Sequence, residues 1–437
     1  MLNTPRNTTK LSALLGSASV FTLASIINAA IPFFLLPILT RYLSPSDYGI
    51  VAMFQILTAL ALPLVGLSIY GAIRRQYFER EEIDLPVYIG NCLVLLLAAT
   101  AVWALVFWIF ATPIGELFAF PASWLSAVWM VCAAQVVTQV LLAMWQVQNR
   151  SVRFGIFQIL LTAANLGLSI GLVVGLSFDW RGRVLAQVVA PVLFGMIAFG
   201  LLIGQGWVRF RIRPAYMRHA LRFGVPLIPH IIGMAAITMI DRVMVANLID
   251  VGAAGVYVVA AQVCAVLFLL QGSFNQAWVP WVFDQLKNGN AADKQRIVAF
   301  TYVYDACFLL LALLLAWIGP WLLGFLVGEA FADAGAFIFW LALAYAFSAM
   351  YKMVATFIFY QEKTHLLAGI TFSTGVVNIG ATYVLILRNG AVGAAQGTAL
   401  AFLSAFLLTW VLAAKVYKMP WFSFFRQTRQ QVAPWWS

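Results

Sequence analysis

The chain has 437 residues, of which 63% are hydrophobic and only 9% are charged, and its mean hydropathy is +0.94. This composition excludes a soluble globular protein, because apolar runs of membrane-spanning length recur from one end of the sequence to the other. The formal net charge of +11 does not indicate nucleic-acid binding, since the basic residues stand in short connections between the apolar runs. The sequence therefore predicts an all-α polytopic membrane protein.

Twelve apolar stretches are long enough to cross a bilayer as helices, which takes about 20 residues each. They lie near residues 11–36, 48–70, 87–111, 124–147, 155–177, 184–205, 223–248, 255–282, 298–326, 334–360, 367–387 and 392–415. The connections are short, so no soluble domain is inserted. We expect four parts: an N-terminal six-helix bundle (1–206), a cytoplasmic basic linker (207–222), a C-terminal six-helix bundle (223–415) and a cytoplasmic tail (416–437).

The Lys and Arg residues indicate the orientation of the spans. With the N-terminus placed inside, twenty of the 26 basic residues fall in inner segments, two (Arg242 and Lys352) fall within spans, and four fall in outer segments: Arg41, Arg181, Arg183 and Arg388. Cytoplasmic loops carry the excess of basic residues in membrane proteins. We therefore expect both termini in the cytoplasm.

A short repeat relates the two halves. Leu43–Gly49, between the first two spans, matches Ile249–Gly255, between the seventh and eighth, at an offset of 206, and Leu185–Gln187 matches Ala394–Gln396 at an offset of 209. Membrane transporters are commonly built from such repeats. The repeat predicts two six-helix bundles around a central cleft.

The stretch Gly224–Leu248 carries polar groups that are expensive inside a membrane. Pro226 and Pro229 predict a bend near its start. His230 and Asp241 lie eleven residues apart on nearly the same helical face. We interpret this helix as the wall of a polar transport cavity, in which the two titratable groups couple transport to an ion gradient.

The charged residues within the spans have functional and structural interpretations. Asp241 and Arg242 point about 100° apart as neighbours on a helix, so we expect that they do not neutralise each other. Arg41 is a candidate partner for Asp241, and Asp305 is one for Lys352. Alternatively, the long side chain of Lys352 reaches the membrane interface.

Four stretches resemble the polysaccharide transporter family, which includes the O-antigen flippases and belongs to the multidrug/oligosaccharidyl-lipid/polysaccharide exporter superfamily. They are Leu36–Leu43 with Asp47–Gly49, Pro226–Pro229 with Asp241–Arg242, Gly255–Tyr257, and Gln276–Pro280. The resemblance implies alternating access of two six-helix bundles. It also implies a flippase that moves lipid-linked oligosaccharide on polyprenyl diphosphate to the outer leaflet of the bacterial cytoplasmic membrane, in polysaccharide or O-antigen biosynthesis.

Such a cargo requires cations for the phosphates and amides for the sugars. The expected substrate-binding residues are Arg41, Arg242, Lys352, Asn28, Gln55, Gln262, Gln271 and Asn275, and other amides within the spans include Asn165 and Asn378. The expected ion-coupling residues are Asp241, His230 and Asp305. No nucleophile–base constellation, metal-ligand cluster or nucleotide-binding motif occurs, so we expect a transporter without a cofactor rather than an enzyme.

Two alternatives remain open from the sequence. One is an ion-coupled antiporter of drugs or cationic metabolites on the same scaffold, which would favour a cavity rich in carboxylates. The other is a membrane-embedded glycan polymerase or glycosyltransferase, which would favour a large extramembrane loop or an acidic catalytic motif. The expected partners are lipid-linked oligosaccharide, membrane lipids and a polysaccharide polymerase complex, with no nucleic acid, and the expected state is a monomer.

Overall fold

A computed structural model describes residues 33–288 and 291–421. Within these ranges the chain folds into helices joined by short turns and has no strand. Among the described residues, ten helices are long and apolar enough to cross a membrane, or up to 11 if the bent pair Pro214–Ala235 and Thr238–Leu248 counts as one span. The predicted fold class, an all-α polytopic membrane protein with about twelve helices, is confirmed, although the span predicted at 11–36 lies mostly outside the described residues.

Packing divides the chain into a first unit that ends at Gly255 and a second unit that begins at Val256. The division falls inside helix α11 (Val251–Asn288), because α10 (Ile228–Leu248) packs on α2 (Pro45–Gly66) of the first unit. The predicted domain limits and the central cleft stay predictions.

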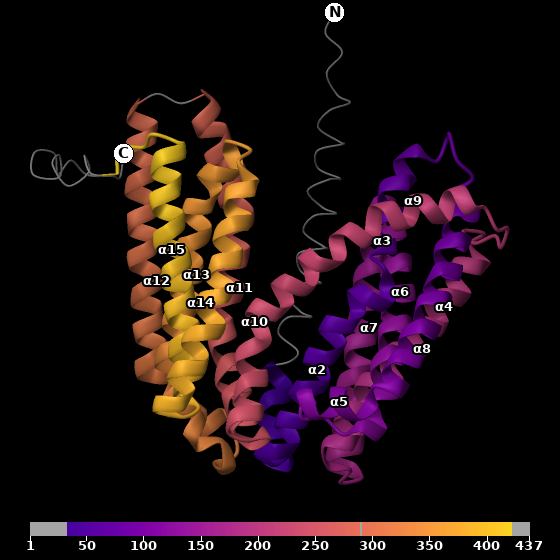
Figure 1. Cartoon of the computed structure of the whole chain (residues 1–437), viewed down its shortest axis with the longest axis horizontal. Coiled ribbons are helices and arrows are strands. Elements are labelled where there is room, and N and C mark those ends of the chain that lie inside the picture. The colour runs from indigo at the N-terminus through magenta and orange to yellow at the C-terminus, as the bar shows by residue number, and fades with distance from the viewer. Residues whose placement is uncertain (1–32, 289–290, 422–437) are drawn as a thin grey trace, which may run out of the picture. The chain divides into compact units, whose positions relative to one another are not determined.

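The described part of the first unit begins with the short helix Phe33–Tyr42, followed by α2. A capping box stabilises the start of α2: Ser44 Oγ accepts a hydrogen bond from the Asp47 backbone N–H, and Asp47 Oδ2 accepts one from the Ser44 backbone N–H. It continues with α3 (Ile69–Gln76), α4 (Leu85–Ile109), α5 (Ala111–Leu117), α6 (Leu125–Val147), α7 (Ser151–Ile170, extended by a π-helical turn to Gly175) and α8 (Asp179–Gly204). Helix α6 packs on α2, α4 and α8, and α7 packs on α8 (Figure 1).

The segment that follows α8 is held against the first unit. The buried amide of Asn91 on α4 donates to the Arg211 carbonyl oxygen at 2.8 Å and accepts from the Arg213 backbone N–H at 2.9 Å. Helix α9 (Pro214–Gly224) then packs on α3 and α4 (Figure 1). The stretch predicted as a basic linker therefore consists of an extended, anchored segment and a helix.

The structure does not place the bend at Pro226 and Pro229, where the sequence predicted it. Pro226 stands in a 3-10 turn, Val225–Leu227, and Pro229 stands in the first turn of α10, where a missing N–H costs little because that group has no partner within the helix. The main bend, of 57°, lies between Ala235 and Thr238 instead.

The second unit contains α11 from Val256, α12 (Ala291–Leu326), α13 (Gly335–Tyr360), α14 (Thr364–Asn389) and α15 (Val392–Val416). Helix α13 packs on α12 and α15, and α15 packs on α14. Aromatic rings join α11 to its neighbours: the Phe274 and Tyr304 centroids are 4.5 Å apart, and those of Phe268 and Tyr345 are 6.1 Å apart. The long apolar helices thus form a bundle with polar groups at a few interior positions.

Candidate functional site

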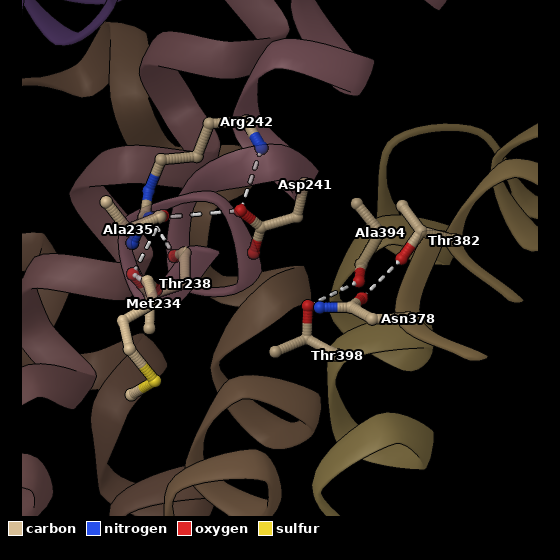
Figure 2. A network of polar contacts seen from close by, with 9 residues as sticks. All are labelled: Met234, Ala235, Thr238, Asp241, Arg242, Asn378, Thr382, Ala394 and Thr398. Atoms are coloured by element: carbon tan, nitrogen blue, oxygen red, sulfur yellow. Dashed lines mark hydrogen bonds and ion pairs between the residues drawn. The ribbon is translucent and has the colours of Figure 1, made fainter. Parts of the chain in front are cut away.

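Asp241 and Arg242 on α10 are coupled to each other. The Arg242 backbone N–H donates to Asp241 Oδ1 at 2.8 Å, and Arg242 Nη1 lies 3.7 Å from the same oxygen. Figure 2 shows the guanidinium folded back along the helix, where Nη1 donates to the Thr238 carbonyl oxygen at 2.6 Å. The expectation that these neighbours do not neutralise each other is therefore wrong, because the long Arg242 side chain spans the angle between them.

The other predicted residues of the first unit differ in their burial. Asp241 is only 4% exposed, whereas His230, on the same helix, is exposed. Arg41 and Gln55 are exposed as well. The pairing of Arg41 with Asp241 stays a prediction, and Asn28 lies outside the described residues.

Lys352 on α13 lies over an aromatic ring of the second unit. Its Nζ is 4.8 Å from the Phe268 ring centroid on α11, a distance at which a cation is attracted to the face of the ring. The prediction that Asp305 on α12 pairs with Lys352 is wrong, because these two described residues form no ion pair within 4.0 Å. The aromatic ring provides the alternative partner.

Two predicted polar residues are buried in the second unit with unused hydrogen-bonding atoms. Gln271 on α11 is fully buried, and both of its side-chain polar atoms lack a partner among the described residues. Asp305 is 8% exposed, and its Oδ1 lacks a partner there too. Gln262 and Asn275 of α11 are half-buried. Since buried polar groups are nearly always paired, Gln271 and Asp305 stand out as described residues with unused hydrogen-bonding capacity in the second unit.

A second group of polar side chains lies where α14 and α15 are in contact (Figure 2). Thr382 Oγ1 donates to Asn378 Oδ1 at 3.0 Å, and Thr398 Oγ1 donates to the Ala394 carbonyl oxygen at 3.1 Å. A Cβ at Gly397 would lie 2.7 Å from Thr382 Cα, so the two helices are in direct backbone contact here. Sequence reasoning included only Asn378 of this group, because hydroxyls that bond within their own helix carry no recognisable pattern.

Sequence reasoning missed Arg183. It was expected in an outer connection, but α8 begins at Asp179, so Arg183 lies just over one turn inside the helix. Its Nη1 donates to Asn165 Oδ1 at 2.6 Å and to Ser169 Oγ at 2.5 Å, both on α7. Asn165 Nδ2 in turn donates to the Ala186 carbonyl oxygen at 3.2 Å. The signal that was available is the pair Asn165 and Ser169, four residues apart on one face of the preceding span.

Arg183 and Lys352 share one property, which is that no carboxylate faces them. Every Asp and Glu of the sequence lies within residues 33–288 and 291–421. None of them forms an ion pair within 4.0 Å of the Arg183 guanidinium or the Lys352 ammonium. Even Asp179, one turn before Arg183, does not pair with it. Each bundle thus holds a cation with neutral neighbours inside a membrane-spanning helix, which suits an anionic ligand.

Comparison with known proteins agrees with this architecture. The family described as "Polysaccharide biosynthesis protein" matches residues 14–286. Two proteins of Haemophilus influenzae (strain ATCC 51907 / DSM 11121 / KW20 / Rd) are similar over most of their length. An "uncharacterized membrane protein" is 23% identical, and the match covers 86% of this chain and 91% of the relative. "Lsg locus putative protein 1" is 22% identical, and the match covers 84% of this chain and 90% of the relative.

Solved structures show the same fold at low sequence identity. The inward closed conformation of the lipid II flippase MurJ matches with a TM-score of 0.69 and 13% identity, covering 94% of this chain and 95% of the other. An inward-facing multidrug resistance MATE family transporter of the MOP superfamily matches with a TM-score of 0.68 and 14% identity, covering 92% and 96%. With the family match covering more than half of the sequence, the chain belongs to the polysaccharide biosynthesis protein family and is a multi-pass membrane protein.

Proposed function

We propose that the protein flips lipid-linked oligosaccharide repeat units, carried on polyprenyl diphosphate, from the inner to the outer leaflet of the bacterial cytoplasmic membrane. Its termini face the cytoplasm, and it moves the units by alternating access, as a step of O-antigen or related polysaccharide biosynthesis. The family supports a role in polysaccharide biosynthesis, and the similar fold of a lipid II flippase supports the movement of a lipid-linked cargo.

The observation that carries this proposal is the pair of cations without carboxylates. A diphosphate head group that crosses the membrane needs compensating charge, and guanidinium and ammonium groups supply it through charge-assisted hydrogen bonds. Arg183 offers such a charge in the first unit, and Lys352 offers one in the second. The buried amide of Gln271 adds hydrogen-bonding capacity of the kind that sugar hydroxyls use.

A second candidate function, the antiport of a cationic compound, is favoured by one observation. Asp305 is buried with an unpartnered Oδ1, and a cationic substrate would satisfy it. Against this, Asp241 is already held by Arg242. Of the described charged residues that are candidates for the site, Asp305 is a carboxylate without a cation partner, and Arg183 and Lys352 are cations without a carboxylate partner. This balance favours an anionic cargo.

A deletion experiment in the bacterial host tests the proposal. Loss of the gene should remove the surface polysaccharide and accumulate lipid-linked repeat units, because synthesis continues on the inner leaflet while export stops. Re-expression of the chain should restore both to normal. Unchanged surface glycan in the deletion strain, together with increased sensitivity to cationic drugs, would support the antiporter instead.

A further inference from the structure

A pocket of about 490 Å³ lies at one end of the first unit, where α4 begins and α6 and α8 end. Its polar and aromatic lining consists of Tyr77, Arg80, Asp84, Gln148, Trp207 and Arg209. The excess of basic residues predicts that this end of the unit faces the cytoplasm. None of these residues belongs to the candidate transport site described above.

One wall of the pocket has a fixed backbone. The Arg209 backbone N–H donates to the Pro86 carbonyl oxygen at 3.0 Å. A Cβ at Gly90 would lie 2.2 Å from the Arg209 carbonyl oxygen, so this segment rests directly on the backbone of α4. Because Asn91 also holds the two ends of Arg211–Arg213, Arg209 enters the pocket from an anchored extended segment.

The two arginines of the lining are available to an anion. Neither Arg80 nor Arg209 forms an ion pair within 4.0 Å with any Asp or Glu, all of which lie in the described part of the chain. Arg80 lies 4.4 Å from the Tyr77 ring centroid and donates from Nη1 to the Tyr77 carbonyl oxygen at 3.1 Å, which orients its guanidinium. The acid of the lining, Asp84, caps α4, where its Oδ1 accepts from the Val87 N–H at 3.3 Å.

Gln148 supplies an unused acceptor. Its Oε1 is buried and receives no hydrogen bond from the described residues. A buried acceptor without a donor costs about 1–3 kcal/mol, so a ligand hydroxyl that donates to it would be bound favourably. Trp207 and Tyr77 add aromatic rings to the lining, each with an arginine over one face: Arg150 over Trp207 and Arg80 over Tyr77. Their other faces suit the C–H groups of a sugar ring. The lining thus combines phosphate-binding and sugar-binding groups.

We propose that this pocket binds a glycosyl phosphate, with the phosphate held by Arg80 and Arg209 and a sugar hydroxyl donating to Gln148 Oε1. The head group of a lipid-linked glycan and a soluble nucleotide sugar or sugar phosphate share this chemistry. The site goes beyond the proposed function, because binding here requires no transport.

Direct binding measurements on the full chain in nanodiscs test the site, with labelled glucose 1-phosphate and inorganic phosphate as probes. Wild type should bind glucose 1-phosphate saturably and more tightly than inorganic phosphate. Arg209→Ala should weaken both by about tenfold or more, whereas Gln148→Leu should weaken only glucose 1-phosphate, by about tenfold. Arg153→Ala is the matched control, since this exposed arginine near the start of α7 does not line the pocket, and it should change neither affinity.

Competing ligands identify the source of the glycosyl phosphate. Displacement of the label by a polyprenyl diphosphate-linked saccharide alone assigns the pocket to a lipid head group, and displacement by UDP-glucose as well assigns it to soluble ligands. The absence of saturable binding, unchanged affinities in both pocket variants, or equal displacement by phosphatidylglycerol would overturn the proposal. A protein that binds glucose 1-phosphate here but moves no lipid-linked glycan would keep the site and refute the proposed function.

Discussion

Gly49 of α2 and Gly255 of α11 lie against each other in a symmetric crossing. A Cβ at Gly49 would lie 2.0 Å from the Val251 carbonyl oxygen, and one at Gly255 would lie 2.0 Å from that of Pro45. These four residues form two pairs separated by 206 positions, which is the offset of the repeat seen in the sequence. The two copies of the repeat therefore meet at their glycines, and each presents the same carbonyl oxygen to the other.

This crossing predicts that neither glycine tolerates a methyl group. Gly49→Ala and Gly255→Ala should each destabilise the protein by about 1–3 kcal/mol, because the added Cβ overlaps a backbone oxygen that cannot move alone. The measurement is the thermal midpoint of the purified protein in detergent. Gly200→Ala on α8 is the control, since nothing lies within 4 Å of its Cβ position, and it should leave the midpoint unchanged or raise it slightly. An unchanged midpoint in both crossing variants would contradict the close contact.

Arg183 should be required for export but not for insertion into the membrane. Arg183→Ala removes a cation that has only neutral neighbours, so export of lipid-linked glycan should fall by about tenfold or more. Arg183→Lys should restore part of it, since it keeps the charge but loses the planar fork. Export is measured as surface glycan at matched protein levels.

Arg181→Ala is the matched control for Arg183. Arg181 is exposed two residues earlier on the same helix, and its guanidinium lies 5.4 Å from the Trp180 ring centroid. Its loss should leave export near the wild-type rate. Equal export by Arg183→Ala and wild type would show that Arg183 only fastens α7 to α8.

Lys352 is expected to act through its charge. Lys352→Met keeps most of the apolar stem but removes the ammonium, so it should reduce export, whereas Lys352→Arg should retain much of it. Phe268→Leu serves as a comparison, because it removes the ring beneath Nζ and leaves the cation in place. If Lys352→Met exports as well as wild type, the residue is a packing element of α13.

The sequence was sufficient to predict most of the fold, because the length of each apolar stretch and the distribution of Lys and Arg between the stretches can be read directly from it. It predicted the long apolar helices of the described residues and the short repeat around Gly49 and Gly255. It could not predict that residues 205–213 are anchored on α4, because that depends on the buried side chain of Asn91, which reads from sequence as an ordinary polar residue.

The candidate site was less predictable, because the contacts of its residues depend on the conformation of long side chains and on the positions where helices begin. Arg242 reaches Asp241 only because its side chain folds back along α10, and Arg183 lies within a helix because α8 begins at Asp179, before the apolar run. Lys352 finds an aromatic ring rather than Asp305, a choice that depends on how α11, α12 and α13 pack. The contact of Lys352 with Phe268 links distant parts of the sequence, and no local pattern encodes it.

The buried carboxylate of Asp241 is expected to couple transport to an ion gradient, whereas exposed His230 is expected to be dispensable. In liposomes, Asp241→Asn should lose the response of transport to an imposed proton gradient, and His230→Gln should keep it. Asp333→Asn, an exposed residue of the Glu329–Ala334 turn, should behave as wild type. A normal gradient response in Asp241→Asn would assign Asp241 to the structural pair with Arg242.

The most direct test of the central claim is leaflet-resolved flipping by the purified chain in liposomes. One batch carries a fluorescent polyprenyl diphosphate-linked oligosaccharide, a second carries a polyprenyl-linked saccharide without phosphate, and a third is loaded with a cationic dye. Accessibility of the glycan to an external lectin or quencher reports its leaflet. We expect rapid flipping of the diphosphate-linked glycan, little flipping of the neutral one, no dye efflux, and loss of flipping in Arg183→Ala with Lys352→Met. Dye efflux without movement of the diphosphate-linked glycan would refute the proposed flippase activity.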